Sequence, residues 1–247
     1  MFKMIVFDMD GTLTLSRGDM QPTMISLFKE LLTKYKVGVI SGGDFCQFET
    51  QILKFIGNNE DLLKNLYICP TCSTKMYIFK DKSWQKLYGI DFTNDEKLHI
   101  ISVLENAINK LGLKPEKTYG ELIEDRGTQI SYAAIGQQAP HEVKSIYDPD
   151  FKKRLKIRDY IKDDLKGFEV LVAGRSTIDI TREGVDKAYG VQKLMDVTGI
   201  NKNEIIFVGD AVFPGGNDYP PLDKLGITTK KVFELNDTEE FIRELIK

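Results

Sequence analysis

The chain has 247 residues, of which 42% are hydrophobic and 29% are charged, and its formal net charge is −3 at pH 7. This composition excludes a mostly disordered chain and is typical of a globular protein with one large domain or two modest ones. The acidic balance argues against broad nucleic-acid binding, and no apolar run approaches the roughly 18 residues of a membrane span, so we expect a cytoplasmic protein without a membrane partner.

Three short apolar runs predict buried strands of a parallel sheet. They are residues 3–7, 37–40 and 205–208, and each ends in polar or turn residues. After the first run, apolar side chains at helical spacing predict a helix through Ile25, Phe28, Leu31, Leu32 and Tyr35. Strands that alternate with helices predict a doubly wound, Rossmann-like α/β core, in which the chemistry gathers at the carboxyl ends of the strands.

The middle of the chain predicts a second unit of a different kind. An amphipathic helix is indicated by Leu98, Ile101, Leu104, Ile108 and Leu111. Residues 150–164 predict another helix, rich in Lys and Arg, and residues 129–133 and 176–180 alternate like half-exposed antiparallel strands. We therefore expect an α+β domain over residues 82–183, inserted into a core of residues 1–81 and 184–247.

The three cysteines, Cys46, Cys69 and Cys72, are an odd number that suits a reducing compartment better than a disulfide framework. The Cys-x-x-Cys spacing of Cys69 and Cys72 is compatible with zinc or redox chemistry, but no second pair follows and the histidines are only His99 and His141. We expect buried or loop thiols.

Two carboxylates two residues apart, Asp8 and Asp10, follow the first predicted strand. Like charges this close are tolerated mainly when a cation lies between them or one is protonated. In phosphoryl transfer Asp8 can attack phosphorus, while Asp10 protonates the leaving oxygen and deprotonates the incoming one. Gly11 permits the tight turn, and Thr12 offers a hydroxyl and an amide to the phosphate. Read alone, the segment is also compatible with a plain polar turn.

The third predicted strand also ends in acids, and these predict a magnesium site. Mg²⁺ prefers oxygen ligands, often one or two carboxylates with waters and phosphate. Asp8, the Asp10 carbonyl and Asp210 can supply the protein's share, with Asn217 and Asp218 orienting them from behind.

Ser41 follows the second predicted strand, and with the amides of Gly42 and Gly43 it is expected to open a helix and bind phosphate oxygens. Ser41 as an ordinary N-cap is the alternative. Lys187, expected at a helix start, has the right sign to stabilise charge on Asp8 and on the transferring group. Its alternative role is that of a solvated surface lysine.

These four segments, in this order, resemble the four motifs of the haloacid dehalogenase superfamily. The resemblance implies a nucleophile at Asp8, an acid and base at Asp10, and Ser41, Lys187 and Asp210 in the later motifs. The insertion between the second and third motifs resembles the type IIB cap of the superfamily's sugar-phosphate members.

A closer similarity is to the eukaryotic-type phosphomannomutases. It is carried by residues 8–14 with Arg17, residues 41–45, Arg126-Gly127, Ile135-Gly136, residues 184–187 and residues 214–218. The resemblance implies that Arg17, Arg126, Thr177 and Asp179 bind the sugar phosphate.

The chain departs from that family at three positions of the predicted cap. Gln137 stands where the family has an arginine, Lys144 replaces a further arginine, and Arg175 replaces a usual glutamine. Lysine cannot imitate the planar, bidentate fork of arginine. We count Lys144 and Arg175 among the substrate-binding residues, and expect the other cap cations Arg154, Arg158 and Arg182 to be solvated.

Two functions remain open. One is a hexose-phosphate mutase that interconverts mannose 1-phosphate and mannose 6-phosphate through phosphorylated Asp8, with Mg²⁺ and a hexose 1,6-bisphosphate activator. The other is a sugar-phosphate phosphatase in which Asp10 activates water.

The resemblance also implies a homodimer through the cap. A non-catalytic binding module would be expected to lack the acids, and all of them are present.

Overall fold

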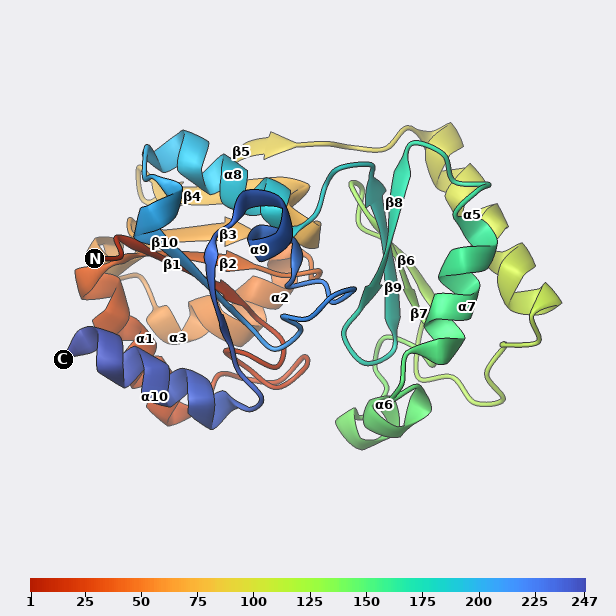
Figure 1. Cartoon of the computed structure of the whole chain (residues 1–247), viewed down its shortest axis with the longest axis horizontal. Helices are drawn as coiled ribbons and strands as arrows, with labels where there is room; N and C mark the ends of the chain where they lie inside the picture. Colours follow the sequence, from red (N-terminus) through yellow and green to blue (C-terminus); the bar gives the residue numbers. More distant parts are fainter. The chain divides into compact units, whose positions relative to one another are not determined.

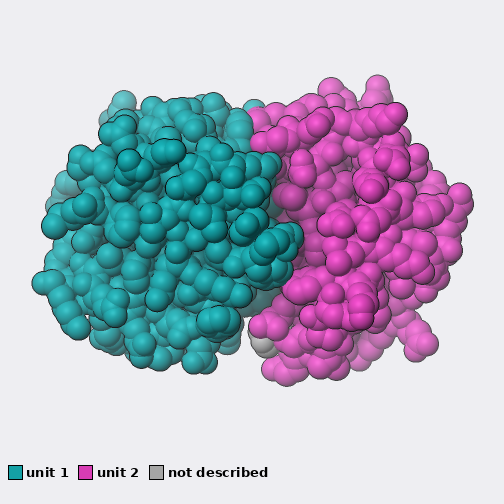
Figure 2. Space-filling model, viewed as in Figure 1, with its two compact units in different colours: residues 1–89, 186–247 teal, residues 90–185 magenta. Residues whose placement is uncertain are grey.

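A computed structural model of the chain describes residues 1–247, apart from the side chain of His141. The chain divides into two compact units (Figure 2). Unit 1 consists of Met1–Gly89 and Asp186–Lys247, and unit 2 of Ile90–Val185. The first boundary lies beyond the predicted residue 81, because β5 (Ser83–Gly89) pairs with β4 (Lys75–Lys80) and so belongs to the sheet of unit 1.

Unit 1 is built on a seven-stranded sheet with the order β11-β10-β1-β2-β3-β4-β5 (Figure 1). Its other strands are β1 (Met4–Asp8), β2 (Lys36–Ile40), β3 (Leu66–Cys69), β10 (Ile205–Gly209) and β11 (Thr228–Lys231). From β11 to β3 the strands are parallel, and the β4–β5 hairpin extends one edge in antiparallel fashion. The predicted doubly wound core is confirmed.

Helices cover both faces of this sheet, as Figure 1 shows. Alternate side chains of β1 enter two cores: Ile5 and Phe7 pack with α1 and α10, and Met4 and Val6 pack with α8. The long helices are α1 (Pro22–Lys34), α8 (Lys187–Thr198) and α10 (Leu235–Ile246). The shorter ones are α2 (Phe45–Phe48), the π-helix η1 (Glu49–Leu53), α3 (Lys54–Ile56), α4 (Glu60–Leu63), α9 (Pro220–Leu225) and the 3₁₀ turns η2 (Thr71–Ser73) and η3 (Lys202–Glu204).

Unit 2 has a four-stranded antiparallel sheet with the order β6-β7-β9-β8. The strands are β6 (Ile123–Asp125), β7 (Ile130–Ala133), β8 (Phe168–Ala173) and β9 (Thr177–Arg182), and the helices are α5 (Asn94–Lys110), α6 (His141–Tyr147) and α7 (Lys152–Ile161). The helices α5 and α7 lie along one face of the sheet (Figure 1), where they share a hydrophobic core with β7 and β9.

Two details of unit 2 differ from the sequence predictions. Leu98 is 67% exposed, because the apolar face of α5 is formed by Ile100, Leu104, Ala107 and Ile108. The strand β7 is buried on both sides rather than half-exposed, as is most of β9, since these are the two central strands of the sheet. Among the described residues, no helix is long and apolar enough to cross a membrane.

Candidate active site

Three polar residues follow neighbouring parallel strands of unit 1. Asp8 ends β1, Ser41 follows β2, and Asp210 follows β10. Since β10, β1 and β2 are adjacent and parallel, their carboxyl ends lie at the same edge of the sheet. The structure thus brings together three segments that are far apart in the sequence.

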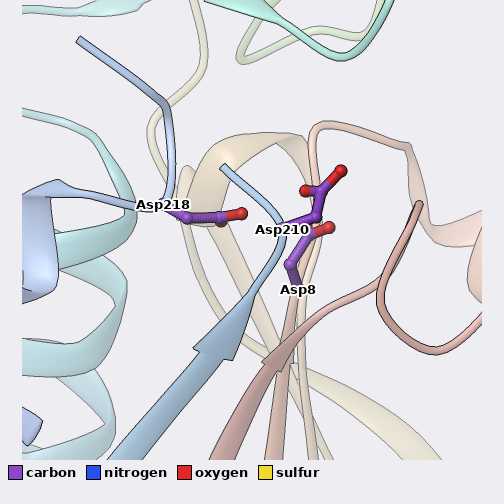
Figure 3. A group of neighbouring side chains, drawn as sticks. All are labelled: Asp8, Asp210 and Asp218. Atoms are coloured by element: carbon purple, nitrogen blue, oxygen red, sulfur yellow. The ribbon is translucent and has the colours of Figure 1, made fainter. Parts of the chain in front are cut away.

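A group of three carboxylates lies at this edge (Figure 3). One side-chain oxygen from each of Asp8, Asp210 and Asp218 lies within 4.8 Å of the others. Asp218 comes from the loop between β10 and α9, and the backbone amide of Ala211 donates a hydrogen bond of 2.9 Å to it. Its carboxylate neighbours those of Asp8 and Asp210 and accepts a hydrogen bond from Lys187, and its expected role in orienting the metal ligands stays a prediction.

Lys187 is the cation of this group. It is the first residue of α8, is 2% exposed, and donates from Nζ to Asp8 Oδ1 and to Asp218 Oδ1 at 2.5 Å each. The predicted helix start is therefore confirmed, and the surface alternative for Lys187 is wrong. Burial alone would lower the pKa of Lys187, but the carboxylates of Asp218 and Asp8 raise it overall, so the amine stays protonated.

The carboxylates respond to burial in the opposite direction. Burial raises the pKa of Asp8 well above its ordinary value, against the lowering effect of Lys187. For Asp210, burial and the neighbouring charge of Asp218 raise the pKa to about 6. In both cases the largest cause is burial, which disfavours the charged form, and the neighbouring carboxylates add to it.

Glycine is required at two points where backbone and carboxylate meet. Gly11 has a φ of +94°, and a Cβ there would lie 2.6 Å from Asp210 Oδ2. At Gly209 a Cβ would lie 2.5 Å from Asp218 Oδ2. Any larger residue would push Asp210 or Asp218 out of the group, so both glycines are part of how the site is formed.

The second aspartate of the first motif, Asp10, is held by hydrogen bonds of its own. Its Oδ1 accepts one bond from the backbone amide of Arg17 (2.9 Å) and one from Nε2 of Gln51 (3.3 Å). Gln51 lies in the π-helix η1 and is 2% exposed. The sequence does not reveal this contact, because nothing in the local pattern separates Gln51 from a surface residue of a helix.

Two hydroxyl groups, in the segments that follow β1 and β2, are of a kind that can bind an anion. Thr12 is fully buried, and its Oγ1 has no hydrogen-bond partner among the described residues. Ser41 Oγ accepts a hydrogen bond of 3.0 Å from the amide of Gly43, so this amide is engaged within the loop. The following helix begins at Phe45 with Asp44 as its N-cap, so neither Ser41 nor the glycine pair opens it.

Asn217 is partly buried in the loop that carries Asp218, and Arg17 is exposed in the turn after β1. The backbone of Arg17 has a φ of +56°, a left-handed conformation that is uncommon for a non-glycine residue. The hydrogen bond from its amide to Asp10 therefore fixes a turn that its own sequence does not favour.

The predicted substrate-binding residues of unit 2 occupy different environments. Arg126 is buried and forms an ion pair of 2.6 Å with Glu124. Asp179 is buried and accepts a hydrogen bond of 2.7 Å from Ser131 Oγ, opposite it in the sheet. Thr177, at the start of β9, is partly buried.

The three positions that depart from the phosphomannomutase pattern are also in unit 2. Lys144 is 8% exposed and its Nζ donates a hydrogen bond of 3.2 Å to the carbonyl of Gln137. A cation therefore lies beside the position where an arginine was expected. Arg175 is exposed in the turn between β8 and β9.

Arg154 is fully buried, so the prediction that it is solvated is wrong. Its guanidinium forms an ion pair of 2.9 Å with Asp148 and donates to the carbonyls of Ala173 and Gly174 at 2.9 Å each. It thereby holds the turn that carries Arg175. Arg158 pairs with a neighbouring exposed aspartate, as expected for a residue near solvent.

No cysteine belongs to a group of described side chains that could hold a metal ion. Cys46, Cys69 and Cys72 are free thiols, and the two of the Cys-x-x-Cys segment are buried. Burial raises the pKa of the Cys69 thiol, which makes it unreactive. The described His, Cys, Asp and Glu side chains show a metal-compatible group only at Asp8, Asp210 and Asp218, while the side chain of His141 lies outside the described residues.

The fold of this chain is similar to that of a haloacid dehalogenase-like hydrolase, as the comparison with solved structures shows. A haloacid dehalogenase-like hydrolase from Bacteroides thetaiotaomicron superposes with a TM-score of 0.62 at 15% identity, covering 99% of this chain and 100% of that chain. The Plasmodium falciparum IMP-nucleotidase gives a TM-score of 0.70 at 17% identity, covering 99% of this chain and 68% of that chain. At these identities the likeness shows the fold.

The sequence comparisons identify the family within this fold. The family model for eukaryotic phosphomannomutase matches residues 24–247. A phosphomannomutase from Spinacia oleracea is 30% identical over 87% of this chain and 84% of its own length, and a probable phosphomannomutase from Caenorhabditis elegans is 25% identical over 98% and 95%. The chain belongs to the eukaryotic phosphomannomutase family and is an enzyme, a phosphomannomutase-like phosphotransferase.

Proposed function

We propose that this enzyme interconverts mannose 1-phosphate and mannose 6-phosphate through a phosphate ester on Asp8. The observation that carries the proposal is the group of Asp8, Asp210 and Asp218, two of which bond to the buried Lys187. The unpartnered hydroxyl of Thr12, in the turn after β1, adds to it. Membership of the phosphomannomutase family supplies the substrate.

The donor set of the group fits Mg²⁺. The ligand atoms are carboxylate oxygens, which hard divalent cations prefer, and burial raises the pKa of both Asp8 and Asp210. We propose that Asp8, Asp210 and the carbonyl of Asp10 hold the ion, with Asp218 and Asn217 orienting the site. When bound, Mg²⁺ screens the approach of an anionic phosphate to an anionic nucleophile.

The chain's own residues then have separate tasks. A carboxylate oxygen of Asp8 attacks phosphorus, and Lys187 stabilises the charge that develops there. Thr12 Oγ1 donates a hydrogen bond to a phosphate oxygen, and Asp10 delivers a proton to the departing sugar oxygen. In the mutase, Asp8 is first phosphorylated by a hexose 1,6-bisphosphate. In the return step Asp10 removes the proton from the free hydroxyl of a bound hexose monophosphate, and the oxygen of that hydroxyl takes the phosphoryl group from Asp8 as the bond from Asp8 to phosphorus breaks.

We propose that unit 2 is the cap that binds the rest of the substrate. A mutase must hold a second, non-reacting phosphate while the first reacts, and this requires cations. The candidate cations are Arg126, Lys144 and Arg175 in unit 2 and Arg17 in unit 1. Thr177 and Asp179 offer hydrogen bonds to the sugar.

The homodimer implied by the family stays a prediction, which analytical ultracentrifugation tests.

A phosphatase is the second candidate, and one observation favours it. Gln137 replaces an arginine expected in the phosphate-binding cap, and the carbonyl of the same residue accepts the hydrogen bond from Lys144. Without the bidentate fork of an arginine, the cap binds the second phosphate less tightly. Water activated by Asp10 can then reach phosphorylated Asp8 in place of the sugar hydroxyl.

The experiment that separates the two is to incubate the enzyme and Mg²⁺ with mannose 1-phosphate, with and without a hexose 1,6-bisphosphate. Mannose 6-phosphate and free phosphate are both measured. Bisphosphate-dependent formation of mannose 6-phosphate supports the mutase. Release of phosphate without isomerisation overturns it in favour of the phosphatase.

A further inference from the structure

The amide of Gln51 joins three parts of the active site in unit 1. Nε2 lies within hydrogen-bond distance of Thr14 Oγ1 (3.1 Å), the carbonyl of Gly18 (3.1 Å) and Asp10 Oδ1 (3.3 Å). On its other side, Oε1 accepts a hydrogen bond of 3.3 Å from Gln47. Both polar atoms of this buried side chain are therefore engaged, and Nε2 faces Asp10.

The local backbone explains how a glutamine in a helical segment reaches this place. Gln51 lies in the π-helix η1, between the α-helical turns α2 and α3. A π-turn contains one more residue per hydrogen-bonded ring than an α-turn, and it rotates the side chains that follow. Such turns are frequent at functional sites. Here the turn directs a polar side chain inward, where the flanking Phe48, Ile52 and Leu53 are buried and apolar.

The contacts of Gln51 extend to the turn after β1. Its backbone carbonyl accepts a hydrogen bond of 3.3 Å from the amide of Met20, and its side chain binds the carbonyl of Gly18. Arg17 lies next to Gly18, has a φ of +56°, and donates its amide to Asp10. Gln51 therefore contacts both Asp10 and the turn that contains Arg17.

We propose that Gln51 is a positioning residue for phosphoryl transfer: it holds the carboxyl group of Asp10 in the orientation needed to protonate the leaving oxygen, and it fixes the turn that presents Arg17. This inference rests on the proposed function, because it assumes that Asp10 is the acid. Gln51 acts through its hydrogen bond to Asp10.

The chemistry provides a readout that a purely structural role would not move. The bond from Asp8 to phosphorus forms as the bond from phosphorus to the leaving oxygen breaks, and that oxygen keeps the electron pair. A sugar oxygen must take a proton from Asp10 as it leaves, whereas p-nitrophenolate departs as a stable anion. Misplacing Asp10 therefore harms the sugar ester selectively.

The experiment compares mannose 1-phosphate with p-nitrophenyl phosphate for the wild type, Gln51→Glu and Gln51→Leu. Gln51→Glu keeps the shape but replaces the donor with an acceptor, and Gln51→Leu removes both. Since a general acid contributes roughly 10²- to 10⁴-fold, we expect the single-turnover rate of leaving-group release from mannose 1-phosphate to fall at least about tenfold, and that of p-nitrophenolate release less than about threefold. Single-turnover rates are compared because the later hydrolysis of phosphorylated Asp8 also uses Asp10. Gln85→Glu, on the β5 strand of the edge hairpin, is the control and should behave as wild type.

The outcomes are distinguishable. Equal loss on both substrates, or no loss on either, overturns the role of Gln51, provided that near-UV circular dichroism shows at least one of the two variants to be folded. If the wild type does not act on mannose 1-phosphate but cleaves another alkyl phosphate, only the proposed substrate is overturned. The rates with p-nitrophenyl phosphate are then compared with those for that alkyl ester.

Discussion

Asp210→Asn should stabilise the metal-free enzyme at neutral pH while abolishing its activity. The substitution keeps the shape of the side chain and removes one of three neighbouring negative charges. Burial and Asp218 raise the pKa of Asp210 from 3.8 to about 6, so the ionised form is disfavoured in the folded state relative to the unfolded one. The stability linked to this proton is present below about pH 4 and is lost as the pH rises through 6.

The size of the effect follows from that shift. One pKa unit corresponds to about 1.4 kcal/mol, so a rise from 3.8 to about 6 corresponds to about 3 kcal/mol at full ionisation. Asp210 is partly exposed and interacts with Asp218, which reduces the expected gain to about 1–3 kcal/mol at pH 7.5. At pH 4 the wild type and the variant should have nearly equal stability.

The assay is urea unfolding in a chelator at pH 4 and pH 7.5, followed by tryptophan fluorescence. The single tryptophan, Trp84, packs against the core of unit 1, so its signal reports the unit that holds Asp210. Asp223→Asn, an exposed aspartate of α9, is the matched control and should change the free energy of unfolding by less than about 0.5 kcal/mol. Added Mg²⁺ should stabilise the wild type more than Asp210→Asn.

Two results would refute this reasoning. Asp210→Asn that is less stable than the wild type at pH 7.5 in chelator would show that the carboxylate stabilises the fold by contacts other than those described. An equal gain at both pH values would show that the effect is not electrostatic.

Three further substitutions test the rest of the site. Asp8→Asn should eliminate acid-stable labelling of the protein by radioactive phosphate from the substrate, with a native circular dichroism spectrum; labelling at the wild-type level would exclude Asp8 as nucleophile. Lys187→Met leaves Asp8 and Asp218 buried without their cation, so urea unfolding should show a loss of about 3–5 kcal/mol at pH 7.5 and less at pH 4; an unchanged midpoint would contradict the buried pair. Arg154→Met leaves Asp148 without its ion pair and removes the hydrogen bond to the turn at Gly174, so calorimetry should show that the free energy of unfolding falls by about 3–5 kcal/mol. The control Arg158→Met, nearer to solvent, should change it by less than about 0.5 kcal/mol. Equal effects of the two substitutions would contradict the prediction.

The positions of Asp8, Ser41 and Asp210 could be predicted because they depend on a strong local signal. A short apolar run followed by turn residues predicts a buried parallel strand, and parallel strands place their carboxyl ends together. The contacts that the sequence does not reveal depend on longer-range geometry. Asp218 reaches the carboxylate group through the loop between β10 and α9, whose path no periodicity describes.

Gln51 and Arg154 show two other limits of the sequence. Gln51 faces inward because of a π-turn, and a helical pattern with 3.6 residues per turn does not reveal that extra residue. Arg154 belongs to a helix rich in Lys and Arg, which is typical of a solvated surface. Its burial depends on Asp148 and on two carbonyls of a turn far along the chain, and these partners come together only in the folded unit.

The charge of the carboxylate group is more easily explained by function than by stability. When ionised, three carboxylates and one ammonium carry a net charge of −2 in a largely buried site. Lys187 bonds to both Asp8 and Asp218, but one ammonium balances only one of the two carboxylates, and Asp210 adds a third negative charge. A divalent cation held by Asp8 and Asp210 would neutralise this excess and would let an anionic phosphate approach Asp8 without net repulsion. The imbalance therefore predicts that cation binding precedes or accompanies binding of the phosphate ester, and that neither ligand alone fills the site as tightly as both together.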